Sequence, residues 1–166
     1  MSTPDREESE VNPATAVDPQ STTARGEPRW FFGGLVQVKA SAADTGGQYT
    51  LLDVTMPPNA AAPLHVHHSE DEGFHVLEGS ATIHVGDESV TLGPGQHAFG
   101  PREVPHRFDI GPDGAHMLWV LTPGGFEALV EEASVPAATP TLPPPDVVPP
   151  DDIADIVRRH GNELLG

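Results

Sequence analysis

The sequence predicts an all-β protein, a β-sandwich or a closed barrel, followed by a short helical extension. Short runs of alternating apolar and polar residues follow one another through the middle of the chain. Clusters of Gly, Pro and Asp separate these runs. After residue 125 the pattern changes, and apolar residues recur at helical spacing. The length of 166 residues favours one domain with a core large enough to fold unaided.

The first part of the chain predicts a disordered tail and then two strands. Residues 1–28 mix Glu, Ser, Thr, Pro and Ala without hydrophobic periodicity, which is typical of disorder. Order is expected to begin at the aromatic segment 29–32, where Trp30 would fill core rather than cap the mouth of a barrel. Strands are expected at 35–40 and 48–56. The second would end at Pro57, because proline cannot continue a hydrogen-bonded ladder.

Shorter strands are expected from residue 64 onward. They are predicted at 64–68, 73–78, 81–85, 88–92, 97–99, 105–110 and 115–122. Gly86 and Asp87 predict a tight hairpin, and segments 93–95 and 111–114 predict further turns. The barrel unit, residues 29–133, would thus include a helix at 125–133.

The remaining residues predict a linker and a second helix. Residues 134–150 are rich in Pro and Ala, which is typical of an extended linker. Residues 151–166 predict a C-terminal helix, with Asp151 and Asp152 at its beginning, an apolar stripe, and Gly161 as its stop. Such a helix must dock on its own barrel or on a partner.

Composition excludes several classes of partner and chemistry. The formal charge of −17, from 25 acidic and 8 basic residues, argues against nucleic acid or an anionic membrane surface as a partner. The chain has no cysteine, so any metal would take nitrogen and oxygen ligands. No signal-peptide pattern and no apolar run of membrane-spanning length is found, and a cytoplasmic protein is expected.

One segment, residues 64–79, carries the residues with metal-binding chemistry. His65 and His67 are separated by one residue, so in a strand their imidazoles share a face while Val66 points the other way. Glu72 follows five positions after His67 and can add a carboxylate after a bend. Nine histidines in the chain make one close pair unremarkable, so the neighbouring pattern decides the interpretation.

The spacing of this segment resembles the first signature of the cupin superfamily. That signature reads Gly, five residues, His-x-His, three or four residues, Glu, six residues, Gly. Here it is filled by Asn59, His65, His67, Glu72 and Gly79. The opening Gly is replaced by Asn, a residue that tolerates a positive φ.

A second segment resembles the second cupin signature, which reads Gly, five residues, Pro-x-Gly, two residues, His, three residues, Asn. The counterparts are Gly95, Pro101, Glu103, His106 and Ile110. The signature's internal Gly and its Asn are therefore replaced, while its Pro and His are present. These departures affect the turn before the histidine and the polar contact of the Asn, and they leave the ligand in place.

The resemblance implies a fold and a metal. The fold would be the cupin double-stranded β-helix, or jelly-roll barrel, whose interior holds one divalent transition metal ion. Its ligands would be His65, His67, Glu72 and His106. Four protein ligands leave one or two positions open for water, dioxygen or substrate. Ligand type does not choose among Fe, Ni, Cu, Co, Mn and Zn.

The other titratable residues of this region are interpreted as structural or solvated. His68 would lie on the opposite strand face from His67. Glu70 and Asp71 miss the ligand spacing and would form a solvated acidic turn. Structural roles are favoured for the remaining strand histidines, which are His75, His84, His97 and His116.

Within the superfamily, the chain resembles single-domain cupins related to flavonol 2,3-dioxygenases over about residues 29–166. The resemblance lies in EDEGFHVLEG, TPGGFE and RRHGNELLG. It implies an aromatic small-molecule substrate and dioxygen, with loss of carbon monoxide in the flavonol case. Glu72 would be ligand and catalytic base, a role that requires burial to raise its pKa. One difference argues against a flavonol as the substrate, since such enzymes often have Tyr where this chain has His75.

An apolar pocket suited to a flat aromatic is expected around Phe74, Phe99, Phe108 and Ile110. Two other functions stay open. The protein could be a non-oxidative isomerase, cyclase or lyase of natural-product biosynthesis, in which the metal polarises a carbonyl. It could also bind a metal or small ligand without catalysis. Sheet edges and the apolar C-terminal helix favour a homodimer.

Overall fold

The computed structural model describes residues 26–166, so most of the tail expected at 1–28 lies outside the described residues. At the start of the described part, the amide of Gly26 donates to the carbonyl of Val38 over 3.2 Å. The strands are β1 (Arg29–Phe31), β2 (Gly34–Ala40), β3 (Thr50–Met56), β4 (His65–His67), β5 (Asp71–Val85), β6 (Glu88–Leu92), β7 (His97–Gly100), β8 (His106–Thr122), β9 (Val135–Pro136) and β10 (Asn162–Leu164). The helices are α1 (Ala42–Thr45), α2 (Glu127–Glu132) and α3 (Ile153–Arg159).

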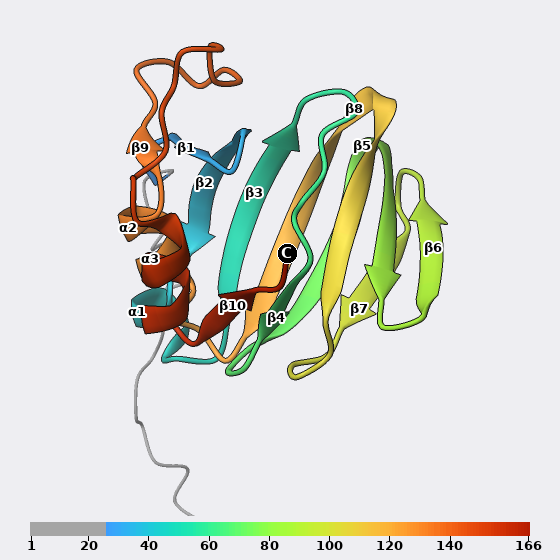
Figure 1. Cartoon of the computed structure of the whole chain (residues 1–166), viewed down its shortest axis with the longest axis horizontal. Helices are drawn as coiled ribbons and strands as arrows, with labels where there is room; N and C mark the ends of the chain where they lie inside the picture. Colours follow the sequence, from blue (N-terminus) through green and yellow to red (C-terminus); the bar gives the residue numbers. More distant parts are fainter. Residues whose placement is uncertain (1–25) are drawn as a thin grey trace, which may run out of the picture.

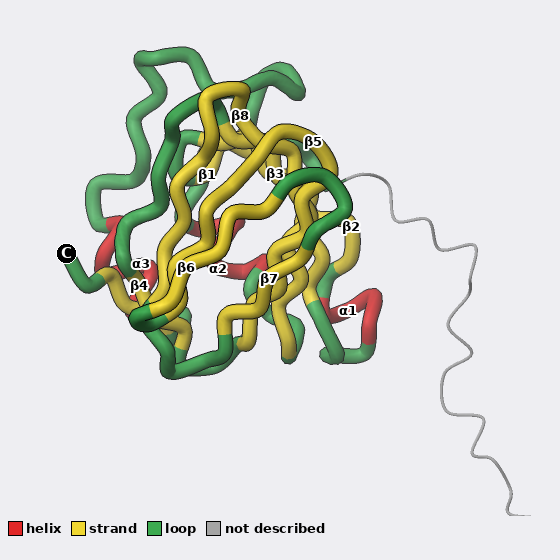
Figure 2. Tube along the Cα trace, turned by 90° about the vertical axis from the view of Figure 1, so that its right-hand side faces the viewer, coloured by secondary structure: helices red, strands yellow, loops and turns green. Residues whose placement is uncertain are grey.

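The long strands β5 and β8 hold two layers of antiparallel sheet together. Their halves 71–79 and 115–122 pair in one layer, where β8 continues to β3, β2, β1 and β9, and β5 pairs with β7. Their other halves, 81–85 and 106–110, pair in the second layer, where β5 pairs with β6, and β8 with β4 and then β10. Figure 2 shows these strands curling into a barrel. The predicted all-β jelly-roll fold is confirmed.

Each long strand was expected as two short ones. The register between β5 and β8 shifts on either side of Gly79, first between Val76 and Glu78 and then between Gly79 and Ala81. Gly79 has φ of 72°, and a Cβ there would meet the carbonyl oxygen of Gly114 at 2.0 Å. The turn signals are therefore bulges, at which each strand bends from one layer into the other without ending.

The helices gather at the end of the barrel where β1 and β9 lie (Figure 1). Helix α3 buries Ile156 and Val157 within its own chain, so its apolar stripe docks on the barrel. The linker expected at 134–150 is partly fixed to the barrel, because β9 pairs with β1. Trp30 donates its indole N–H to the carbonyl of Thr141 over 2.8 Å, while Phe31 is the buried aromatic of this segment.

Two segments differ from the sequence prediction. Residues 42–45 form α1, where no helix was predicted, because Ser41 and Asp44 make a capping box. The polar residues 44–47 had predicted only a turn. The helix expected within 151–166 covers only Ile153–Arg159. Gly161, with φ of 76°, ends it as predicted, and the chain then forms β10 beside β4. Among residues 26–166, no helix has the length and apolar character needed to cross a membrane.

Candidate metal centre

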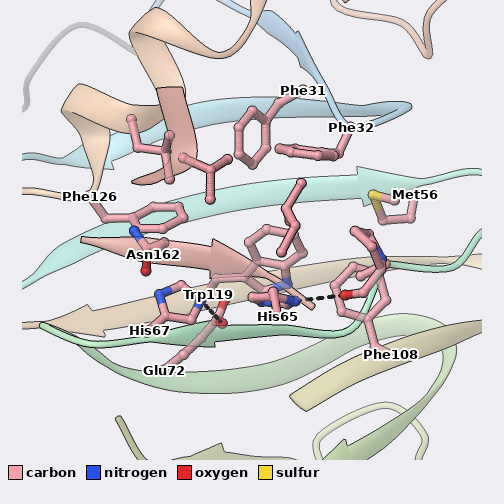
Figure 3. A pocket seen from close by; sticks show the side chains of 15 residues that line it. Phe31, Phe32, Met56, His65, His67, Glu72, Phe108, Trp119, Phe126 and Asn162 are labelled. Atoms are coloured by element: carbon pink, nitrogen blue, oxygen red, sulfur yellow. Dashed lines mark hydrogen bonds and ion pairs between the residues drawn. The ribbon is translucent and has the colours of Figure 1, made fainter. Parts of the chain in front are cut away.

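Three strands bring the four predicted ligands together inside the barrel. Figure 3 shows three of them, His65, His67 and Glu72. His65 and His67 lie on β4, Glu72 on β5 and His106 on β8, and one donor atom of each lies within 4.8 Å of the others. His65 is the register partner of His106 across β4 and β8. His67, Glu72 and His106 are buried, and His65 is half-buried. The arrangement is a three-histidine, one-carboxylate cluster of the kind predicted from the sequence.

Backbone carbonyls orient two of the histidines. Nδ1 of His65 lies 2.8 Å from the carbonyl oxygen of Pro63, and Nδ1 of His106 lies 3.0 Å from that of Val104. A carbonyl only accepts, so each Nδ1 must carry the proton and donate it. In a neutral ring this leaves the Nε2 lone pair free for a cation.

The carboxylate of Glu72 lies at the centre of the cluster. Its Oε2 is 3.1 Å from Nε2 of His106 and 3.2 Å from Nε2 of His67. With Nδ1 of His106 already protonated, two lone pairs would face each other across 3.1 Å unless a proton or a metal ion lies between them. Nε2 of His67 is also buried, without a hydrogen-bond partner among residues 26–166. These donors fit a divalent transition metal ion.

Glu70 is not the solvated residue that was expected. It is 8% exposed, and its Oε2 lies 3.7 Å from Nδ1 of His67, on the side of the ring away from Glu72. Both Oε2 and that Nδ1 are buried, and neither has a hydrogen-bond partner in the described part of the chain. Its position three residues after His67 turns the side chain back to the ring, a relation that strand alternation alone did not reveal. Asp71, by contrast, pairs with Arg102 over 2.8 Å.

Burial and neighbouring charges move the pKa values of the cluster apart. Burial lowers the pKa of His65 to about 4, so this ring is neutral at neutral pH. Burial also opposes charge on His67, but the carboxylates of Glu70 and Glu72 outweigh it and raise its pKa to about 9. For Glu72, contacts with His106 and His67 outweigh burial and hold its pKa below the ordinary value. The condition set for Glu72 as a base, a raised pKa, is therefore not met in the metal-free protein.

The remaining histidines lie outside this cluster. His68 pairs with Glu103 over 3.1 Å at the surface, as expected for the opposite strand face. His84 pairs with Asp109, and His116 with Asp53, each over 2.8 Å. The rings of His75 and His97 lie near each other, with centroids 6.2 Å apart.

The two residues that replace signature glycines keep the positive φ that glycine would allow. Asn59 has φ of 58°, and Glu103 has φ of 65°. The amide of Glu103 donates to the carbonyl of His67 over 2.7 Å, which joins the turn before His106 to the strand of the other histidines. Ile110, in place of the signature's Asn, is buried in the apolar core.

An apolar pocket leads from the cluster to the surface, with a cavity volume of about 60 Å³. His65, His67 and Glu72 line its inner part. Aromatic rings supply much of the remaining wall, namely Phe31, Phe32, Phe108, Trp119 and Phe126. Phe32 is 37% exposed, while the other four rings are buried. The aromatic segment 29–32 therefore supplies part of this wall as well as core.

Of the predicted pocket residues, the structure places only Phe108 in the wall. Phe74 is fully buried behind it, with its ring against those of His106, Phe108 and Trp119. The expectation for Phe99 is wrong, because its side chain is 56% exposed on β7. Ile110 belongs to the core and does not line the pocket.

Other wall residues were not predicted, because distant segments supply them. Asn162 and Leu164 come from β10, Val157 from α3 and Leu129 from α2. Asn162 is the register partner of His67, so the last strand lies beside the histidine strand. The helical spacing of apolar residues after residue 151 indicated that this segment docks on another surface. It did not indicate which surface.

Comparison with known proteins agrees with this geometry. The sequence profile of the cupin domain matches residues 52–121, which include all four ligand candidates. Quercetin 2,3-dioxygenase from Aspergillus japonicus is 28% identical to this chain over 102 residues. The match covers 57% of this chain and 29% of that enzyme, so the chain spans less than a third of the relative's length.

Solved structures of similar fold include an RmlC-like cupin from Shewanella frigidimarina, with a TM-score of 0.53 and 17% identity over 61% of this chain and 88% of that one. KdgF from Halomonas sp. has a TM-score of 0.52 and 17% identity, covering 58% of this chain and 84% of that one. A mutant of oxalate decarboxylase from Bacillus subtilis has a TM-score of 0.54 and 22% identity, covering 68% and 33%. These structures show a likeness of fold. The match of residues 52–121 to the cupin domain, together with the barrel and the two signatures, supports placing the chain in the cupin superfamily.

Proposed function

We propose that this protein is a metal-dependent dioxygenase acting on a hydroxylated aromatic small molecule. The observation that carries the proposal is a cluster of three imidazoles and one carboxylate at the inner part of a pocket walled by aromatic rings. The likeness to a quercetin 2,3-dioxygenase supports a substrate of this class. The apolar wall suits a flat ring, while the cluster suits the oxygen atoms attached to it.

His65, His67, Glu72 and His106 would hold one divalent ion, either Fe, Ni, Cu, Co, Mn or Zn. When bound, the ion supplies Lewis acidity and a site at which a substrate hydroxyl and dioxygen can meet. The Nδ1 contacts of His65 and His106 hold these rings in orientation. Glu70 would hold His67 from behind.

The remaining wall would bind and orient the substrate. Phe108 and Trp119, whose ring centroids are 5.5 Å apart, form one corner of the pocket, and Phe126 lies 5.3 Å from the ring of His67. These rings exclude water from the ligand cluster, which strengthens electrostatic interactions there. Glu72 is the only carboxylate in the described wall and would receive the proton of the substrate hydroxyl. Its lowered pKa keeps the group ionised, as ligation and acceptance of a proton both require, although it makes Glu72 a weak base.

The size of the pocket bears on the substrate. A cavity of about 150 Å³ in another protein binds benzene, whereas this one measures about 60 Å³. An aromatic ring would therefore be only partly enclosed in the conformation described. A flavonol would extend through the mouth beside Phe32, or would displace that half-exposed side chain. We propose single-ring hydroxylated aromatics as the first substrates to test, and flavonols as the second.

Elemental analysis of protein purified without added metal, followed by dioxygen uptake, tests the proposal. We expect about one transition metal ion per chain. We also expect dioxygen consumption with at least one member of a panel of single-ring hydroxylated aromatics, flavonols and polyketide phenols. Conversion of a substrate without dioxygen uptake would instead identify a non-oxidative tailoring enzyme. Metal binding with no conversion would indicate a binding protein.

We also propose a homodimer formed through the exposed edge strands β6 and β7. Val90 and Phe99 lie on these strands with 48% and 56% of their surface exposed. The C-terminal helix, which had favoured dimerisation, is occupied by its own barrel. Light scattering after gel filtration would report the mass. A wild-type dimer that becomes a monomer on Phe99→Ser substitution would support this interface, and a wild-type monomer would refute it.

A further inference from the structure

Apart from the ring nitrogens of His67, two buried polar atoms in the pocket wall have no hydrogen-bond partner among the described residues. They are Nε1 of Trp119, on a residue that is 6% exposed, and Oδ1 of Asn162, on a residue that is 3% exposed. Both residues line the pocket that contains His65 and Glu72 (Figure 3). A buried polar group without a partner costs about 1–3 kcal/mol, so two in one pocket indicate that a ligand completes them.

The orientation of Asn162 follows from its other contact. Its Nδ2 donates to the carbonyl of His160 over 3.1 Å. Because that carbonyl can only accept, the amide nitrogen must face it and Oδ1 must face the other way. Antiparallel pairing with His67 places Asn162 beside the ligand cluster. The pocket therefore offers a fixed acceptor near its inner part.

Trp119 offers the complementary group. Its backbone is fixed on both sides in the sheet, with Leu52 as partner on β3 and Phe74 on β5. Its indole lies against the rings of Phe74 and Phe108, with centroid distances of 6.2 and 5.5 Å. An indole nitrogen can only donate a hydrogen bond. The pocket therefore also offers a fixed donor.

We propose that Trp119 and Asn162 select and orient the substrate. The indole N–H donates to a carbonyl oxygen of the substrate, and Oδ1 of Asn162 accepts from a hydroxyl. The substrate class is thus a planar aromatic that carries both a hydroxyl and a carbonyl group. This proposal makes the proposed function more specific, and it rests on that function because it takes this pocket to be the substrate site. Away from the ligand cluster, the other wall side chains are apolar, including Met56, Leu129, Val157 and Leu164.

A series of small ligands tests each contact separately. Meta- and para-hydroxyacetophenone carry both groups, acetophenone carries the carbonyl alone, and phenol carries the hydroxyl alone. Their affinities for the protein, with its metal as purified and under nitrogen, can be measured by calorimetry for wild type, Trp119→Phe and Asn162→Leu. Trp30→Phe is the matched control, because the indole of Trp30 already donates to Thr141 outside this pocket.

Of the two hydroxyacetophenones, the one that wild type binds more tightly is used for comparison. We expect Trp119→Phe to weaken binding of that ligand and of acetophenone by about tenfold, and to leave the affinity for phenol unchanged. Asn162→Leu should weaken binding of phenol and that hydroxyacetophenone by about tenfold and leave acetophenone unchanged. Trp30→Phe should change none of them. Each variant is compared across ligands, so partial loss of fold does not imitate the pattern.

Three results would overturn the proposal. One is that wild type binds none of the ligands. Another is that a variant weakens all ligands equally, as it would if Asn162 only held water on the metal or if Trp119 only filled space. The third is that neither variant changes any affinity. Because no turnover occurs under nitrogen, failure of the dioxygen assay would refute the reaction without refuting this recognition.

Discussion

Nε2 of His106 lies 3.1 Å from Oε2 of Glu72, although Nδ1 of the same ring already donates to the backbone. Both nitrogens of this histidine are therefore used, one for orientation and one toward the centre of the cluster. His67 differs, because both its nitrogens face carboxylates, those of Glu70 and Glu72. This difference predicts separate effects for substitutions in the cluster and behind it.

Replacement of His67 should remove the metal and leave the barrel. In His67→Ala, we expect loss of bound metal and of turnover, since one of the four donors is lost while the apolar core is untouched. Elemental analysis gives the metal content, and circular dichroism reports the fold. His75→Ala, whose ring lies outside the cluster, is the matched control and should keep its metal. Normal turnover by a metal-free His67→Ala protein would refute the mechanism.

Replacement of Glu70 should weaken metal binding without abolishing it. Loss of a carboxylate that supports a ligating histidine typically costs about 10- to 100-fold in metal affinity. Glu70→Gln keeps the size and removes the charge 3.7 Å from His67. Competition with a chromophoric chelator measures the affinity. Glu78→Gln, at an exposed position on the strand that follows, serves as control. Equal affinities of the two variants would show that Glu70 does not act through His67.

Glu127 should make stability depend on pH in the acid range. Burial would raise its pKa, but hydrogen bonds from Thr50, Ala42 and Gly125 outweigh burial and hold the pKa below 4.5. A lowered pKa stabilises the fold above 4.5, and that contribution is lost as pH falls through the folded-state value. Glu127→Gln should therefore be less stable than wild type at neutral pH.

We expect this destabilisation by Glu127→Gln to be about 1–2 kcal/mol, kept small by the partial exposure of the group. The difference from wild type should shrink below pH 4.5. Urea unfolding at several pH values measures it. Glu131→Gln, at an exposed position on the same helix, is the control. A difference that stays constant with pH would mean that the charge of Glu127 is not responsible.

A methyl group at Gly79 should destabilise the barrel more than one at Gly95. Both glycines have positive φ, 72° and 80°, so both substitutions to alanine carry a backbone strain of about 1 kcal/mol. At Gly79 the added Cβ would also meet a backbone oxygen, at 2.0 Å. At Gly95 no described atom beyond its chain neighbours lies within 4 Å of the added Cβ. Thermal melting compares Gly79→Ala with Gly95→Ala, and equal melting temperatures would contradict the clash.

Local patterns predicted the fold and the ligands well for identifiable reasons. The alternation of His65 and His67, and the spacing to Glu72, fix relations within a few residues, which strand geometry determines. Placing His106 beside them required the resemblance of the chain to the two cupin signatures, because no local rule sets the register of β4 and β8. The bulge at Gly79 was interpreted as the end of a strand. A glycine with positive φ occurs both in turns and in bulges, so the sequence alone does not distinguish them.

The pocket wall was predicted poorly because it is assembled from distant segments. Leu129, Val157 and Asn162 reach it only when α2, α3 and β10 dock on the barrel. Phe99 was assigned to the wall from its aromatic character, but the pleat of β7 turns it to the surface. Glu70 was assigned to solvent because it misses the ligand spacing, yet the turn between β4 and β5 buries it behind His67.

The pairing of β10 with β4 has a practical consequence for handling the protein. Leu164 pairs with His65, and the amide of Leu165 donates to the carbonyl of Leu64 over 2.8 Å. A purification tag fused after Gly166 would begin next to the strand that carries two of the metal ligands, and a polyhistidine tag there would compete for the ion. Expression vectors for metal analysis should therefore carry a removable tag at the other terminus.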